Sequence, residues 1–169
     1  PLFVGRWGGN DATASTLPDS TANAHHGTKK AANEPTQIPG KVGPAQSYDG
    51  SDDYIELPFL FDPAATDFTL STWFFASGAE TRVLVSQKNG TGTGRSWMYV
   101  WDDQGLSSYF AAAHRWSGYT VTNGVWTHAV FTWTNSTLQW YIDGIPQNDH
   151  SFTMESADGG HVFGMQTSL

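Results

Sequence analysis

The stretch Trp126-Thr-His-Ala-Val-Phe-Thr-Trp-Thr-Asn-Ser-Thr-Leu-Gln-Trp-Tyr-Ile-Asp-Gly-Ile-Pro146 predicts two strands, with one turn at Thr134-Asn135-Ser136 and another at Asp143-Gly144. Apolar and polar residues alternate with period two, which is typical of antiparallel hairpins. Asp-Gly suits a tight turn because both central positions take positive φ at low cost. On the first strand, Thr127, Ala129, Phe131 and Trp133 are expected on the face opposite to that of Trp126, His128, Val130 and Thr132. On the second strand, Leu138, Trp140 and Ile142 are expected to alternate with Gln139, Tyr141 and Asp143. The stretch therefore predicts a sheet protein.

The composition of the 169-residue chain fits a domain with a neutral polar surface. Charged residues make up only 14% of the chain, and aromatic residues also make up 14%. The net charge of −8 argues against a nucleic-acid partner, because phosphate binding requires Lys and Arg patches. The lack of cysteine excludes a disulfide framework and a thiolate site. No apolar run approaches the roughly 20 residues that cross a bilayer, so we expect no membrane insertion.

Turn signals at short intervals divide the chain into strands, and no stretch shows convincing helical periodicity. We expect a first strand at residues 2–7, a long loop at 8–44, a hairpin over 45–57 and a buried central strand at 67–75. Further strands are expected at residues 82–86, 96–101, 106–110 and 161–165. This pattern predicts an all-β, two-sheet antiparallel jelly-roll sandwich that forms one domain of residues 1–169.

The chain resembles the laminin G-like, concanavalin A-like lectin/glucanase jelly-roll modules of bacterial surface or secreted proteins. Motifs that carry the resemblance are Asp19-Ser-Thr-Ala-Asn23-Ala-His-His-Gly27-Thr28, Pro39-Gly-Lys-Val-Gly43-Pro-Ala45, Tyr48-Asp-Gly-Ser-Asp-Asp-Tyr54-Ile, Phe68-Thr-Leu-Ser-Thr-Trp73, Trp126-Thr-His128 and Tyr141-Ile-Asp-Gly144. Ala22 and Ala24 replace glycines that are usual in the family. The resemblance also implies one more C-terminal strand, which is either truncated here or supplied by a neighbouring chain.

The loop that contains Asp19, Asn23 and His25 is the candidate metal site. The resemblance implies a structural calcium ion bound by the Asp, the Asn and backbone carbonyls, and calcium accepts such irregular sets of oxygen ligands. The alternative is that Asp19 and Asn23 make Asx turns without a metal. A zinc site at His25-His26 is disfavoured, because adjacent histidines seldom both reach one tetrahedral centre.

Four acidic residues, Asp49, Asp52, Asp53 and Glu56, lie close together in the sequence. A second metal site or a catalytic carboxylate pair is one interpretation, but solvated charges at a hairpin turn are the favoured one. Glycoside hydrolysis needs two facing carboxylates, whereas Asp53 and Glu56 are expected on opposite faces of a strand. We therefore expect no enzyme.

Aromatic residues supply the candidate carbohydrate-binding site. On the strand at 96–101, alternate positions are aromatic, and Met98 and Val100 between them suit the core. Flat aromatic rings pack against the apolar faces of sugar rings. The candidate residues are Trp97, Tyr99, Trp101, Trp116 and Tyr119. The alternative is that these rings merely cover the sheet. Trp73, Trp126, Trp133 and Trp140 are assigned to the core.

These features predict a non-catalytic carbohydrate-binding module of a larger secreted or cell-surface protein, stabilised by calcium. Its expected partners are a polysaccharide or glycan and a neighbouring protein chain or domain. The alternative is a structural or adhesive module that contacts protein. Exposed rings of Trp97, Tyr99 and Trp101 favour the first function, and rings packed beneath other strands favour the second.

Overall fold

The computed structural model of the chain describes residues 3–11, 15–30, 34–58, 64–88, 94–110, 113–154 and 161–164. Every regular element in these ranges is a β-strand, and the strands form two stacked antiparallel sheets and a short ribbon. The predicted all-β jelly-roll sandwich is confirmed. No helix that would be long and apolar enough to cross a membrane occurs in the described ranges.

The smaller sheet has four strands in the order β13-β12-β11-β6. They are β6 (Phe68–Phe75), β11 (Trp126–Thr134), β12 (Thr137–Ile142) and β13 (Ile145–Ser151). Asn135 and Ser136 at the first turn, and Asp143 and Gly144 at the second, all have positive φ. Such two-residue turns match the twist of the strands that they join. The hairpins and the alternation predicted from this stretch are confirmed.

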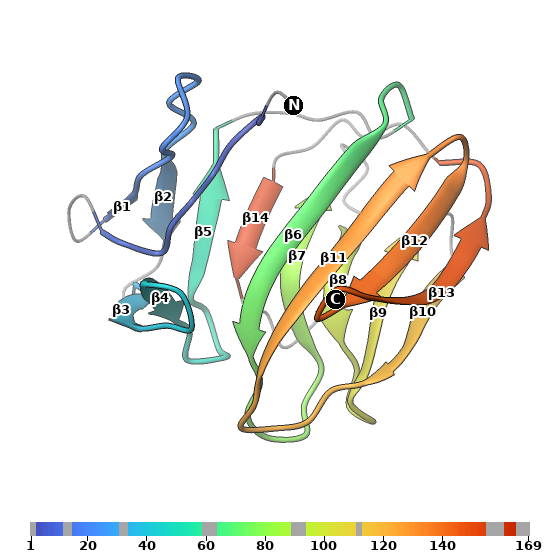
Figure 1. Cartoon of the computed structure of the whole chain (residues 1–169). Coiled ribbons are helices and arrows are strands. Elements are labelled where there is room, and N and C mark those ends of the chain that lie inside the picture. Colours follow the sequence, from blue (N-terminus) through green and yellow to red (C-terminus); the bar gives the residue numbers. More distant parts are fainter. Residues whose placement is uncertain are drawn as a thin grey trace.

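The larger sheet has eight strands in the order β1-β2-β5-β14-β7-β8-β9-β10. They are β1 (Thr16–Leu17), β2 (Gly27–Lys30), β5 (Tyr54–Leu57), β7 (Arg82–Lys88), β8 (Gly94–Val100), β9 (Gly105–Phe110), β10 (Ala113–Thr120) and β14 (His161–Gly164). Figure 1 shows the smaller sheet lying over the part of the larger sheet that contains β7 to β10. The core fills the space between them.

Aromatic and branched side chains from both sheets interlock in this core. Phe131 and Trp140 of the smaller sheet are fully buried and pack edge to face, with ring centroids 5.3 Å apart. Leu106 and Phe110 of β9 belong to the same buried cluster. Trp133 and Trp140 therefore lie in the core as expected.

The N-terminal part of the chain differs from the prediction. Residues 3–6 form no strand, and Trp7 belongs to an isolated β-bridge with Asp19 rather than to a strand. Residues 8–44 are not one loop, because they contain β1, β2 and β3 (Thr36–Pro39). β2 lacks the period-two signal because its buried positions are Gly27 and Lys29 rather than large apolar residues.

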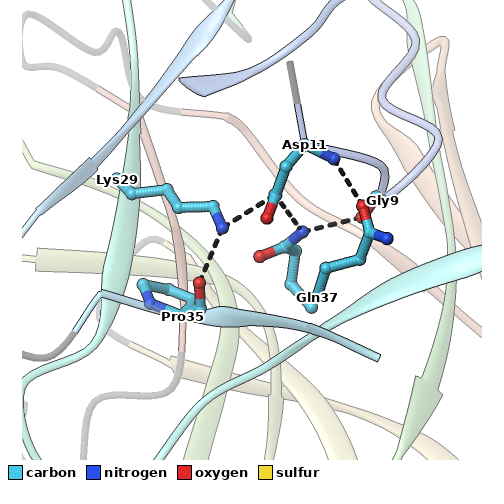
Figure 2. Close-up of polar contacts among 6 residues, drawn as sticks. Gly9, Asp11, Lys29, Pro35 and Gln37 are labelled. Carbon is cyan, nitrogen blue, oxygen red and sulfur yellow. Dashed lines mark hydrogen bonds and ion pairs between the residues drawn. The ribbon is translucent and has the colours of Figure 1, made fainter. Parts of the chain in front are cut away.

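A network of polar contacts holds this region together, as Figure 2 shows. Lys29 Nζ lies 2.7 Å from Asp11 Oδ1 and donates a hydrogen bond to Pro35 O at 2.6 Å. Gln46 Nε2 donates to Asp11 Oδ1 and to Gly9 O, and the Asp11 N–H donates to Gln37 Oε1. The network joins the N-terminal segment to β2 and to the ribbon formed by β3 and β4 (Pro44–Ser47).

The hairpin predicted over residues 45–57 is wrong in its pairing. β4 pairs with β3, whereas β5 pairs with β2 and β14. The prediction that residues 67–75 form a central strand is also wrong, because β6 lies at the edge of its sheet. Trp73 is 39% exposed and stacks on His128 across the strand pair, and Trp126 packs against the exposed Phe75. Trp73 and Trp126 therefore lie on the outer face of the smaller sheet rather than in the core.

The strand predicted at residues 161–165 is confirmed as β14, which lies between β5 and β7. Residues 165–169 lie outside the described residues. The additional C-terminal strand implied by the resemblance, and its supply by a neighbouring chain, stay predictions.

Candidate functional site

Five rings gather on the face of the larger sheet that is opposite to the core. On β9, Leu106 and Phe110 point into the core, so Tyr109 between them points outward. Strand pairing places Tyr109 opposite His114, a residue of β10. We call the group the outer aromatic cluster, and its members are Tyr99, Trp101, Tyr109, His114 and Trp116.

The members of the outer aromatic cluster contact one another. His114 lies at the centre, with its ring centroid 5.2 Å from that of Trp101, 5.1 Å from that of Tyr109 and 5.4 Å from that of Trp116. Trp101 and Trp116 stand nearly perpendicular, at 87° and 6.3 Å between centroids. The Tyr99 hydroxyl hydrogen-bonds with His114 Nδ1. Each ring is thus held in place by its neighbours.

Accessibility differs between the members of this cluster. Tyr99 is fully buried, and this burial raises the pKa of its hydroxyl. Trp101 is partly buried, and Trp116 is 36% exposed. Tyr99 therefore lies beneath the other rings, while Trp101 and Trp116 present ring surface to solvent.

Trp97 lies elsewhere, which corrects the expectation that it shares a face with Tyr99 and Trp101. It is 3% exposed and packs in the core against Phe68 and Phe110, at centroid distances of 4.9 and 5.6 Å. The pairing of β7 with β8 shifts here, since Met98 faces Val85 but Ser96 faces Ser86. Two steps on β8 oppose one on β7, which is a β-bulge, and a bulge re-aims side chains. Trp97 therefore joins Met98 on the core side.

A shallow cavity of about 210 Å³ lies beside Trp116. Its lining residues are Asp103, Gly105, Leu106, Trp116, Gly118, Tyr119 and Thr120. Tyr119 packs partly against the core and also borders this cavity. Asp103 Oδ1 accepts a hydrogen bond from the Gly105 N–H at 3.0 Å, which fixes the carboxylate at the rim.

The structure thus brings together Tyr99, Trp101, Trp116 and Tyr119 of the predicted residues, and separates Trp97 from them. Sequence reasoning missed His114 and Tyr109 as members. The spacing His114-x-Trp116 on one strand would have placed both rings on one face, but residues 111–125 lacked a clear alternation.

The candidate metal loop is held by hydrogen bonds from the protein itself. Asp19 is buried, and its Oδ1 accepts from the N–H groups of Arg6 and Thr21 at 2.8 and 2.9 Å. Its Oδ2 accepts from Thr21 Oγ1 at 2.8 Å and from the His25 N–H at 3.0 Å. A carboxylate has about four lone-pair sites, so these four donors occupy its accepting capacity.

Asn23 and His25 also make contacts within this region. Asn23 Nδ2 donates to Phe3 O and Val4 O at 3.0 and 2.9 Å, and His25 Nδ1 lies 3.0 Å from Val4 O. Calcium requires six to eight oxygen ligands. Here the Asp19 oxygens and the carbonyl oxygens of Phe3 and Val4 already accept hydrogen bonds from N–H and O–H groups of the protein. In this arrangement these oxygen atoms do not fit a calcium centre. Calcium binding by this loop stays a prediction.

Acid should destabilise this loop, because protonation of the Asp19 carboxylate weakens the hydrogen bonds that it accepts. Burial acts to raise the pKa of Asp19, but the hydrogen bonds from Arg6, Thr21 and His25 outweigh it and lower the pKa from 3.8 to about 2. Because the folded-state pKa is depressed, the stabilisation is complete above pH 4 and is lost as the pH falls towards 2. We expect Asp19→Asn to lower the melting temperature by a few degrees at pH 6 and to have little effect near pH 2. Thermal unfolding at several pH values tests this, and a difference that is the same at every pH would contradict it.

Comparisons with known proteins agree with this fold. The family model of the concanavalin A-like lectin/glucanases superfamily, laminin G type, matches residues 49–165, well over half of the chain. No curated protein sequence matches. Among solved structures, domain 4 of AbnA, an extracellular arabinanase from Geobacillus stearothermophilus in complex with arabinotriose, is similar with a TM-score of 0.67 and 20% identity. That match covers 90% of this chain and 79% of the other.

Two further structures show the same architecture. A Trypanosoma rangeli sialidase in complex with 2,3-difluorosialic acid gives a TM-score of 0.63 at 14% identity, over 94% of this chain and 27% of the sialidase. An S-layer domain-containing protein from Clostridium thermocellum gives 0.50 at 19% identity, over 89% of this chain and 73% of the other. With the family match over residues 49–165, these findings show that the chain belongs to the laminin G-like family of the concanavalin A-like lectin/glucanase superfamily.

Proposed function

We propose that this chain is a non-catalytic carbohydrate-binding module of a larger secreted or cell-surface protein. The observation that carries the proposal is the pair of nearly perpendicular rings, Trp101 and Trp116, beside a cavity with a carboxylate at its rim. The ligand is a glycan or polysaccharide.

The chemistry of this surface suits a sugar. A sugar ring has an apolar C–H face that packs on an indole, and hydroxyl groups at its edge that need hydrogen-bond partners. Trp116 supplies an exposed indole, and Asp103 supplies an acceptor beside it. The cavity, at about 210 Å³, is smaller than the pockets that enclose whole drug-sized ligands. It therefore suits one sugar residue of a longer glycan that lies across the sheet.

The similar structures support this proposal. Domain 4 of AbnA has the same fold and was solved with arabinotriose, and it is one domain of an extracellular enzyme. The S-layer protein supports a location at the cell surface. A binding role without catalysis fits the acidic residues as well. Asp53 is buried just before β5 begins, whereas Glu56 lies on the exposed side of β5 and pairs with Lys30, so these two carboxylates do not face one substrate.

Loss of the exposed indole tests the proposal. We expect Trp116→Ala to weaken the binding of a glycan identified on an array by about tenfold or more, because stacking contributes on the order of 1 kcal/mol beyond the buried area. Isothermal titration calorimetry measures the affinity. Trp73→Ala is the matched control, because it removes an exposed indole from the other sheet and should leave the affinity unchanged. Equal affinities of Trp116→Ala and the unaltered protein would contradict the proposed site.

A structural or adhesive protein-interaction module is the second candidate function. Trp73, Phe75 and Val125 are exposed on or beside the smaller sheet, and exposed apolar surface marks interaction sites. The rings of Trp97 and Tyr99 are buried rather than exposed to a ligand, which also favours this candidate. A folded protein that binds no glycan on the array would favour the second function over the first.

A further inference from the structure

The turn that joins β4 to β5 holds three carboxylates at close quarters. Asp49, Asp52 and Asp53 each place a carboxylate oxygen within 4.8 Å of the others. Asp49 and Asp52 are exposed, so solvent and ions reach the group, whereas Asp53 is only 5% exposed. The interpretation of this turn as solvated surface charge therefore fits Asp49 and Asp52 but not Asp53.

The backbone of the turn fixes these carboxylates in place. Asp49 Oδ1 accepts hydrogen bonds from the N–H groups of Ser51 and Asp52, at 2.8 and 3.3 Å. Asp53 Oδ2 accepts from the Asp49 N–H at 2.9 Å, which draws the Asp53 side chain back to the start of the turn. Gly50, with φ of +82°, allows the chain to reverse here. The three carboxylates are thus brought together by local hydrogen bonds.

Asp53 also has an oxygen without a partner. Its Oδ1 is buried and makes no hydrogen bond to any residue that the structure describes. A buried carboxylate oxygen without a hydrogen bond or a counter-charge is costly. Burial raises the pKa of Asp53, and the charges of Asp49 and Asp52 raise it further.

The two lysines near this turn form their ion pairs with other carboxylates, so they do not offset the cost of burying the Asp53 carboxylate. Lys29 is the cation whose charge acts on Asp53, but its ammonium group is engaged with Asp11 and with Pro35 O. Lys30 pairs with Glu56. Among the described residues, neither of these ion pairs includes a carboxylate of the turn. The group therefore combines negative charge, a buried unsatisfied oxygen and an open path to solvent.

We propose that Asp49, Asp52 and Asp53 form a cation site that takes calcium. Calcium binds carboxylate oxygens in irregular arrangements and completes its shell with carbonyl oxygens and water, whereas magnesium demands near-octahedral geometry. A divalent ion would give the Asp53 Oδ1 atom its missing partner and offset the repulsion among the three carboxylates. The site is separate from the Asp19 loop and does not depend on the proposed carbohydrate binding.

Terbium luminescence tests this site on the full chain. Terbium replaces calcium at oxygen sites and emits when a nearby tyrosine is excited, and Tyr48 and Tyr54 adjoin the carboxylates in the sequence. We expect saturable emission that added calcium displaces. Asp52→Asn should weaken terbium and calcium binding by about tenfold or more, since even partners beyond the ligands contribute 10–100-fold. Asp53→Asn should have a similar effect.

Two control variants separate the site from other acidic groups. Glu56→Gln removes a carboxylate of the adjoining strand β5 that lies outside the group, and this variant should bind terbium as the unaltered protein does. Asp19→Asn should also leave the emission unchanged. Because Asp52 is exposed, Asp52→Asn should fold even if Asp53→Asn does not. Absence of saturable emission, emission unchanged in Asp52→Asn, or emission lost only in Asp19→Asn would each overturn the proposal.

Discussion

Replacing Trp97 with alanine is expected to destabilise the protein by about 3–5 kcal/mol, the range for large aromatic residues removed from a core. Trp97 is 3% exposed and contacts Phe68, Phe110 and Phe131. Truncation removes these ring contacts and leaves a cavity between the two sheets, which the surrounding strands fill only in part. Because net stabilities are only 5–15 kcal/mol, the variant should unfold at much lower urea concentration, and urea denaturation followed by fluorescence measures this.

The same experiment separates a core role of Trp97 from a role in ligand binding. Trp97→Phe keeps an aromatic ring and should cost clearly less than alanine. Trp116→Ala removes an exposed indole on the outer face and should change stability by well under half the effect of Trp97→Ala. A folded Trp97→Ala protein of unchanged stability that had lost glycan binding would contradict the structure and restore Trp97 to the binding site.

The parts of the fold that could be predicted from the sequence are those with regular alternation. In β11 and β12 each buried position is apolar or Thr127, and two-residue turns separate the strands, so local sequence determines the face of every side chain. The strand containing Trp97 alternates equally well in sequence, but the bulge that turns Trp97 inward depends on its pairing with β7. Pairing between distant strands is not encoded in the alternation of one strand.

The N-terminal region shows a second limit of sequence reasoning. Lys29 is buried, although lysine normally indicates an exposed position. Its burial is possible only because Asp11 and Pro35 O, from separate segments, meet it. Likewise, the candidate site could be predicted in part. The sequence predicts Trp101 and Trp116 as members, but His114 joins them only through the pairing of β10 with β9.

A second large loss of stability is expected when the buried ion pair between Lys29 and Asp11 is broken. The Lys29 side chain is 1% exposed and that of Asp11 is 25% exposed, with Nζ and Oδ1 2.7 Å apart. Asp11→Ala leaves the ammonium group buried without its counter-charge, and breaking such a pair costs about 3–5 kcal/mol. We expect the lower end of this range, because Asp11 is partly exposed and Pro35 O still accepts a hydrogen bond. Urea denaturation of both proteins measures the difference in the free energy of unfolding.

Removal of both charges distinguishes this mechanism from a simple loss of contacts. In the double variant Lys29→Met, Asp11→Ala, neither charge of the pair remains and the methionine fills the lysine's space, so much of the stability should return. Asp11→Asn keeps an oxygen that can accept from Gln46 Nε2 but removes the charge, and its cost should approach that of Asp11→Ala. If instead the double variant were as unstable as the sum of the single variants, the two residues would act independently, and the ion pair would not be what joins the N-terminal segment to β2.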